Sequence, residues 1–130
     1  MPEVIKPDGW PRPSGFSHGM VATGRVLAVA GQIGAGPEGR LVARDLAGQL
    51  DQALGNVAEV VGAAGGRIDD VVSMTIYVLD RGAYLLAREA LGQVWRRRLG
   101  RHYPALTLVE VSGLVEEGAL VEVQALAVLP

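Results

Sequence analysis

The stretch LVEVQALAV, residues 120–128, alternates between two kinds of side chain. Successive side chains of an extended strand point to opposite faces of a sheet. One face of this stretch is wholly apolar and consists of Val121, Val123, Ala125 and Ala127. The other face is mixed and consists of Leu120, Glu122, Gln124 and Leu126. The alternation predicts a strand that buries one face in a core, and it leaves open whether the Glu122 face meets water or a cleft.

Two helices are expected to cover the apolar side of such a strand. Between Asp45 and Ala64 the apolar residues recur every three or four positions, which is typical of a helix with one buried face. Gly65 and Gly66 end this helix, because glycine readily adopts the left-handed conformation that follows helices. A second helix is expected from about Ala83 to Leu99, and the cations of RRRLGR near its end complement the helix dipole.

Further strands are predicted along the rest of the chain. DDVVSMTIYVLD, residues 69–80, is rich in β-branched residues. The other expected elements are a β-hairpin from about Met20 to Ile33 and strands over Thr107 to Ser112 and Leu120 to Val128. Pro7, Pro11 and Pro13 block regular hydrogen bonding and predict an irregular N-terminal arm over residues 1–15. The order β-β-α-β-α-β-β predicts a single α+β domain over residues 1–130, with two helices on one face of a sheet.

The composition is that of a folded protein and argues against a nucleic-acid or membrane partner. Of the 130 residues, 49% are hydrophobic and 20% are charged, and the formal net charge of -2 does not attract phosphate overall. The absence of cysteine excludes a thiolate nucleophile. The longest apolar runs fall far short of the roughly 20 residues that span a bilayer, and the proline-rich N-terminus is not typical of a signal peptide. We therefore expect a cytoplasmic protein.

Motifs for cofactors and metals are missing from the sequence. GAGPEG, residues 34–39, lacks the Lys-Ser/Thr ending of a phosphate loop. His18 and His102 have no cysteine or paired carboxylate at metal-ligand spacing. The arginine run after Trp95 is more simply a solvated helix end than an RNA-binding patch. No cofactor and no metal are expected.

Glu122 and Glu110 are the carboxylates that interrupt predicted strands. A carboxylate that is partly desolvated in a cleft has a raised pKa and can exchange protons near neutral pH. The alternative is a sheet face that is open to water, and the residue pattern does not decide between the two.

Five stretches of the chain, taken in order, resemble the Rid family, also called the YjgF family, of reactive intermediate deaminases. They are AVAGQIG (28–34), DLAGQLDQALGNVAEVVGAAGG (45–66), DDVVSMTIYVLD (69–80), YPALTLVEV (103–111) and VEVQALAV (121–128). The resemblance implies a chorismate-mutase-like α+β fold that assembles as a homotrimer, with ligand clefts between neighbouring subunits. It also implies hydrolysis of 2-imino or enamine acids to 2-keto acids and ammonia, without a metal or cofactor.

Part of the family's site matches this chain. Glu122 stands where the family has the glutamate that positions or activates the attacking water. Gly31 and Gln32 match the family's GQ pair. The resemblance therefore implies Glu122 as the catalytic residue, with Gly31 and Gln32 contacting the ligand.

Other positions depart from the family pattern. The arginine that holds the substrate carboxylate is replaced by Leu106, and Leu108 follows it on the same strand. Phe16 stands where a tyrosine is usual, and Ala30 where a serine is common. Arg88 stands near a frequent asparagine and is a candidate replacement cation. Leu106, Leu108, Phe16 and Ala30 would together make the acid-binding end of the cleft apolar, which suits a neutral or more hydrophobic ligand.

The loss of the arginine shapes the functional hypothesis. A hydrogen bond from a charged group contributes about 1.5–3 kcal/mol, and about 1.4 kcal/mol is tenfold in affinity. We therefore expect weak or no activity on 2-imino acids, and hydrolysis of some other imine or enamine through Glu122. The alternative is a non-catalytic ligand-binding or regulatory trimer. A ribonuclease is less favoured, because the sequence has neither paired histidines nor a metal-binding carboxylate cluster.

Overall fold

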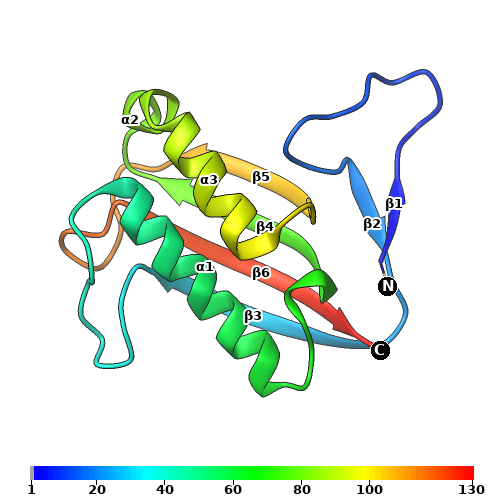
Figure 1. The fold of residues 1–130 in the computed structure, drawn as a ribbon, viewed down its shortest axis with the longest axis horizontal. Coiled ribbons are helices and arrows are strands. Elements are labelled where there is room, and N and C mark those ends of the chain that lie inside the picture. Colours follow the sequence, from blue (N-terminus) through cyan, green and yellow to red (C-terminus); the bar gives the residue numbers. More distant parts are fainter. Residues whose placement is uncertain (1) are drawn as a thin grey trace.

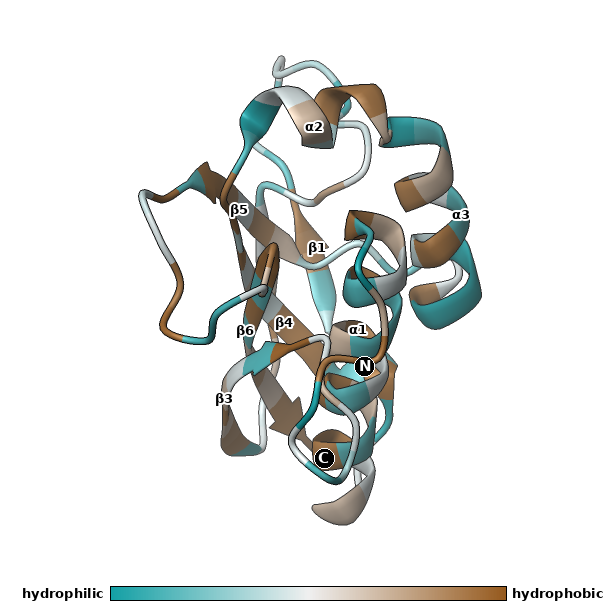
Figure 2. Ribbon diagram, turned by 90° about the vertical axis from the view of Figure 1, so that its left-hand side faces the viewer, coloured by the Kyte–Doolittle hydropathy of each residue, from teal (hydrophilic) through white to brown (hydrophobic). Residues whose placement is uncertain are grey.

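The chain forms two layers, a mixed β-sheet and the helices that cover one of its faces. The computed structural model describes residues 2–130 (Figure 1). The sheet consists of β3 (Arg25–Ile33), β4 (Val71–Val78), β5 (Ala105–Glu110) and β6 (Val121–Leu129). The helices are α1 (Leu46–Ala63), α2 (Arg81–Leu86) and α3 (Arg88–Leu99), and the short 3-10 helix η1 (Ile68–Asp70) precedes β4. Figure 2 shows α1 and α3 on the same side of the sheet.

The order of strands across the sheet is β3-β6-β4-β5. β6 pairs antiparallel with both β3 and β4, whereas β5 pairs parallel with β4. The sheet is therefore mixed, and the predicted α+β architecture is confirmed. In this order β3 and β5 form opposite edges of the sheet.

The alternation in residues 120–128 identifies the buried face correctly. Its apolar residues, Val121, Val123, Ala125 and Ala127, are no more than 2% exposed. They belong to one hydrophobic core with Leu50, Leu54, Val57 and Val61 of α1, which are also buried. Burial of one large aliphatic side chain contributes roughly 1.5–3 kcal/mol, so a strand turned over by one residue would lose most of this core.

Helix α1 lies one residue inside its predicted range at each end. Asp45 caps its first turn, because the backbone N–H of Gly48 donates to the Asp45 carboxylate at 3.1 Å. After the helix, Gly65 adopts φ +87°, the left-handed conformation that the double glycine predicts.

The predicted hairpin over residues 20–33 is wrong. β2 (Gly19–Val21) pairs instead with β1 (Glu3–Ile5) in a separate two-stranded sheet, visible apart from the main sheet in Figure 1. At Gly24, with φ +151°, the backbone passes so close to β6 that a Cβ would lie 2.8 Å from the carbonyl carbon of Leu129. This turn brings β3 alongside the nine residues of β6, a longer partner than the three residues of β2. Because β1 lies within residues 1–15, the arm is not wholly irregular.

The second predicted helix is divided in two. α2 begins at Arg81, where the N–H of Ala83 donates to the capping Asp80 carboxylate at 3.0 Å. At Ala87 the backbone opens to φ -94° and ψ 8°, and α3 continues over the sheet in a new direction. None of the helices within residues 2–130 is both long enough and apolar enough to cross a lipid bilayer.

Candidate functional site

Glu122 lies on the face of β6 that is turned away from the helices, beside a bulge in β3. The β3–β6 pairing shifts register between Val29 and Gln32, which leaves Ala30 and Gly31 without direct partners. The half-buried Glu122 side chain rests against the backbone of Gly31. A Cβ on residue 31 would lie 2.9 Å from the carboxyl carbon of Glu122, a distance that real Cβ atoms do not tolerate. Glycine at position 31 therefore makes room for the carboxylate.

Side chains of both neighbouring strands share the face of Glu122. Its cross-strand neighbours are Ile33 on β3 and Tyr77 on β4. The Tyr77 hydroxyl donates to the side-chain oxygen of Gln124 at 3.4 Å. Sequence reasoning did not name Tyr77 as a site residue. The period-two alternation of β4 could have found it only together with the pairing to β6.

Gln49 of α1 fixes the segment that leads into β6. The residue is fully buried, and its Nε2 donates to the carbonyls of Ala43 at 3.1 Å and Gly118 at 3.0 Å. Its Oε1 accepts from the N–H of Leu120 at 2.7 Å. The chain is thus tied to α1 two residues before Glu122, so the carboxylate is carried by a rigid element.

Leu106 and Leu108 lie on the other face of the sheet from Glu122. In the parallel pairing of β4 with β5, Leu106 is level with Met74 and Leu108 with Ile76. Both partners are buried beneath the helices, and the two leucines are half-buried against the same core. β5 is also the sheet edge farthest from β3. Within one chain, Leu106 and Glu122 therefore do not face a common cleft.

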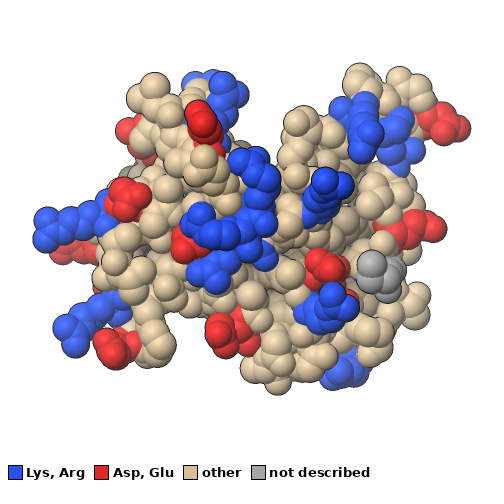
Figure 3. Space-filling view, viewed as in Figure 1, with Lys and Arg blue, Asp and Glu red and all other residues tan. Residues whose placement is uncertain are grey.

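Leu106 lines a pocket of about 420 Å³ between β5 and α3, which we call the α3 pocket. Arg88, which the family resemblance assigns to the same cleft as Leu106, also lines this pocket. The α3 pocket also contains residues that sequence reasoning missed, namely Tyr84, Trp95, Arg96 and Tyr103. Figure 3 shows Lys and Arg side chains gathered along α3.

Tyr84 is the titratable group in the α3 pocket whose pKa departs from its usual range. Burial raises the pKa of the Tyr84 hydroxyl, and the positive charge of Arg88 opposes part of that rise. The hydroxyl is thus protonated at neutral pH and is able to donate a hydrogen bond into the pocket.

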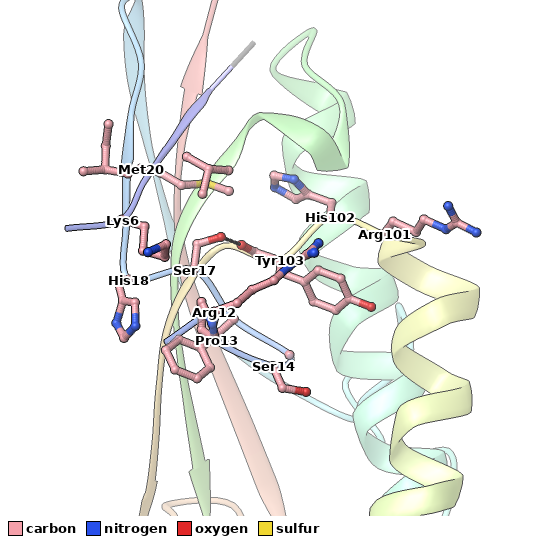
Figure 4. Close-up of a pocket in the computed structure, with 14 residues that line it drawn as sticks. Lys6, Arg12, Pro13, Ser14, Ser17, His18, Met20, Arg101, His102 and Tyr103 are labelled. Atoms are coloured by element: carbon pink, nitrogen blue, oxygen red, sulfur yellow. Dashed lines mark hydrogen bonds between the residues drawn. The ribbon is translucent and has the colours of Figure 1, made fainter. Parts of the chain in front are cut away.

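Phe16 lies in a neighbouring pocket of about 610 Å³ between the N-terminal arm and the segment that precedes β5 (Figure 4). The two pockets share Ser14, Gly15 and Tyr103. The cations that line the Phe16 pocket are Lys6, Arg12 and Arg101, and Figure 4 shows Arg12 reaching toward Tyr103. Phe16 is therefore adjacent to the α3 pocket and not to Glu122.

The two histidines, far apart in the sequence, both line the Phe16 pocket. His18 packs edge-on against Trp10 and Phe16, with ring centroids 5.0 and 5.2 Å away. His102 Nε2 lies 2.7 Å from the carbonyl of Val71 and is engaged there as a donor. Within residues 2–130 no group of three or more His, Asp or Glu is arranged to hold a metal ion.

Glu110, the other carboxylate singled out in the sequence, has a structural partner. Its Oε1 accepts a hydrogen bond from the backbone N–H of Arg81 at 2.9 Å. Arg81 is the first residue of α2, and a carboxylate at a helix N-terminus satisfies an unpaired donor there. Glu110 therefore connects β5 to α2 and lies apart from Glu122.

This geometry defines a small α+β protein with two separate candidate regions for a site. One region is a carboxylate over a glycine backbone at the β3 edge, and the other is a mixed apolar and cationic pocket at the β5 edge. A family model described as Endoribonuclease L-PSP matches residues 11–129. The chain belongs to this family, the Rid or YjgF family.

Relatives with known structures or curated names agree with this membership. A crystal structure of a Rid-family protein of unknown function from Yersinia pestis has a TM-score of 0.86 at 34% identity, covering 98% of both chains. A RutC family protein of Pyrococcus horikoshii is 33% identical over 128 residues, 98% of each chain. The 2-iminobutanoate/2-iminopropanoate deaminase of Salmonella typhimurium is 32% identical over 108 residues, 83% of each chain.

Proposed function

We propose that the protein is a cytoplasmic homotrimer that binds a small metabolite in clefts between its subunits and hydrolyses an imine or enamine there. We further propose that it acts weakly or not at all on 2-imino acids, because Leu106 stands where the family has an arginine. The observation that carries the proposal is the placement of Glu122 and Leu106 on opposite faces and opposite halves of one sheet.

The separation of the two regions supports a cleft shared between subunits. The Glu122 region lies next to the β3 edge, and the Leu106 region lies at the β5 edge. A head-to-tail contact joins different surfaces of two identical chains, and it closes into a ring when the rotation allows. In such a ring the Glu122 region of one subunit meets the Leu106 region of the next. The mass in solution tests this step, since light scattering should give three times the 13.6 kDa of the chain.

The proposed chemistry needs only water and the Glu122 carboxylate. Glu122 accepts a proton from a water molecule as the water oxygen attacks the carbon of the C=N bond. The carboxyl group returns this proton to the nitrogen, which gives an intermediate with a hydroxyl and an amino group on the same carbon. The carboxylate then accepts the hydroxyl proton and passes it to the nitrogen as the C–N bond breaks, so ammonia leaves and a C=O group remains. Transfer of a proton by a positioned carboxylate contributes typically 10²- to 10⁴-fold to such a reaction.

Leu106 sets the expected substrate preference. A half-buried leucine offers no hydrogen bond to a carboxylate beside the reacting carbon, so affinity for small 2-imino acids falls by at least about tenfold. An amino-acid oxidase coupled to detection of 2-keto acids tests this with 2-iminopropionate and 2-iminobutyrate. Turnover as fast as that of an arginine-bearing relative would contradict the proposal.

The reverse substitution gives a second test. Leu106→Arg should raise the affinity for pyruvate by about tenfold or more, as measured by calorimetry on variants whose fold is checked by circular dichroism. Val109→Arg is the matched control, because Val109 lies on the other face of the same strand and is 38% exposed. An equal gain in both variants would show that added charge, and not position 106, is responsible.

A non-catalytic ligand-binding trimer is the competing hypothesis, and Glu122→Gln separates the two. An enzyme should lose turnover by at least about 10²-fold and keep its ligand affinity. A binding module has no turnover to lose. Glu110→Gln makes the same chemical change at a carboxylate that bonds the N–H of Arg81, and its amide oxygen can still accept that bond. This control should leave turnover unchanged.

A further inference from the structure

The arginine side chains of α3 lie in two different environments. Arg97 and Arg98 form ion pairs with Asp51 of α1, at 3.4 and 2.8 Å. Arg88 and Arg96 line the α3 pocket instead, and no Asp or Glu is among the described residues that line it. The arginines on one face of the helix therefore share a carboxylate partner, whereas the other face presents two positive charges to the pocket.

Gly92 lies between these two arginines. Residues 88, 92 and 96 are four apart, so they follow one another along the same side of the helix. The Arg96 guanidinium lies over the bare glycine, with Nη1 3.5 Å from the point where a Cβ would stand. Gly92 thus places no side chain of its own between two cationic residues. Inside a helix, glycine is about four- to fivefold less favourable than alanine.

Aromatic and aliphatic side chains complete the α3 pocket. Trp95 and Tyr103 are parallel to within 1°, with ring centroids 6.4 Å apart. The Trp95 ring is fixed by a hydrogen bond from its Nε1 to the carbonyl of His102 at 3.2 Å. Leu106 and Ile76 add apolar surface from the sheet. The pocket therefore combines flat apolar walls with cations.

We propose that the α3 pocket binds an organic anion with a flat apolar body, its carboxylate held by Arg88 and Arg96 and its ring placed against Trp95. Tyr84 also lines the pocket, and its hydroxyl is a further donor. The proposed anion is the class of ligand for the intersubunit cleft described under the proposed function. The assignment rests on that cleft, because Leu106 belongs both to the cleft and to the α3 pocket. In such a ligand the negative charge is several atoms away from the carbon that reacts, unlike the charge of a 2-imino acid.

Tryptophan fluorescence tests the proposal directly. The chain has two tryptophans, and Trp10→Phe leaves Trp95 as the reporter in the pocket wall. Titration of this variant with phenylacetate should give a saturable change in emission. Phenylacetamide, which has the same ring and no charge, should bind at least about tenfold more weakly. Absence of a saturable change with phenylacetate, or equal affinity for the amide, would overturn the proposal.

Arginine variants identify the binding residues. In the same background, Arg88→Gln and Arg96→Gln should each weaken phenylacetate binding by about tenfold or more. Arg97→Gln removes the same charge from the same helix but from the side that faces Asp51, and it should leave affinity within about twofold. Unchanged affinity in the first two variants, or an equal loss in Arg97→Gln, would contradict the assignment.

Failure of the anion assignment can be told apart from failure of the proposed function. These measurements report binding, so they do not depend on whether the protein turns anything over. Glu122→Gln should retain phenylacetate affinity. If the arginine variants bind like the parent while Leu106→Arg gains pyruvate affinity as expected, only the ligand class is wrong. If the arginines matter but Leu106→Arg changes nothing, the α3 pocket stands and the proposed cleft is wrong.

Discussion

The carboxyl group of Glu122 and the backbone of Gly31 are in direct contact across the β3–β6 pairing. A bulge in β3 brings the Gly31 backbone beneath the side chain, and the lack of a Cβ leaves space for it. The position of the one carboxylate proposed for catalysis therefore depends on a residue that has no functional group of its own.

Gly31→Ala should move the Glu122 carboxylate without unfolding the protein. The new methyl group would overlap the end of a flexible side chain, which can rotate away, so the free energy of unfolding should change by less than about 1 kcal/mol. Amide shifts in two-dimensional NMR spectra should change around residues 31 and 122. Any hydrolysis of 2-iminopropionate should fall at least about tenfold.

Gly62→Ala is the control for this substitution. A Cβ at Gly62, exposed on α1, would contact nothing within 4 Å. The control should keep the parent's hydrolysis rate and gain a little helix stability. If Gly31→Ala behaved in the same way, contact with Gly31 would not be what positions Glu122.

Gln49→Leu should be strongly destabilising. The substitution keeps the volume roughly constant, but it leaves the carbonyls of Ala43 and Gly118 and the N–H of Leu120 without their partner. Each buried polar group left unpaired costs about 1–3 kcal/mol, so the free energy of unfolding in urea should drop by at least about 3 kcal/mol. Gln93→Leu, at an exposed position on α3, should change it by less than about 0.5 kcal/mol.

Asp51 should make stability depend on pH in the acid range. Its pKa is lowered mainly by the hydrogen bond from Arg98, and partial burial opposes this shift. Because the folded pKa is below the unfolded value of about 3.9, the stabilisation is present above that pH and is lost as the pH falls through the folded pKa. The pair is partly exposed to water, so its contribution is about 0.5–1 kcal/mol.

Asp51→Asn measures that contribution. At pH 7 the variant should be less stable than the parent by about 0.5–1 kcal/mol, and the difference should shrink toward pH 2. Asp69→Asn is the control, because the Arg67–Asp69 contact of 3.8 Å is highly exposed. A difference that persists unchanged at pH 2 would show that Asp51 acts through packing and not through its charge.

The fold was largely predictable because its main determinants are local patterns. The period of two in residues 121–127 identifies the buried face of β6, and the recurring apolar residues place α1 within one residue of its ends. β2 was paired wrongly because a strand of three residues carries little pattern of its own. Its partner, β1, comes from a segment whose prolines argue against any strand.

The site was predictable in its residues and not in its geometry. Resemblance to the family gives Glu122 and Leu106 as neighbours of one ligand, but strand order and register place them on opposite faces. No pattern within either strand carries that information, since the order of strands across a sheet is decided by tertiary packing. Arg96 was missed because the run of three arginines in the sequence is typical of a solvated helix end. In the structure Arg97 and Arg98 pair with Asp51, whereas Arg96 lines a pocket.

Gly92→Ala should stabilise the protein. Alanine is better than glycine inside a helix by about 0.8–1.0 kcal/mol. The added methyl group would meet only Arg96 Nη1, at 3.5 Å, which is an ordinary contact distance. The free energy of unfolding in urea should therefore rise by about 0.5–1 kcal/mol.

Gly55→Ala makes the same change in α1, at a position where the added methyl group would be crowded. A Cβ there would lie 3.0 Å from Arg98 Cζ and Nη1, and that guanidinium is held in place by Asp51. The gain in helix propensity should be cancelled or exceeded by displacement of the ion pair, so Gly55→Ala should be no more stable than the parent. If both alanine variants gained equally, helix propensity alone would explain them. If Gly92→Ala gains and Gly55→Ala does not, the difference measures the cost of displacing the Arg98–Asp51 ion pair, because both substitutions bring the same gain in helix propensity.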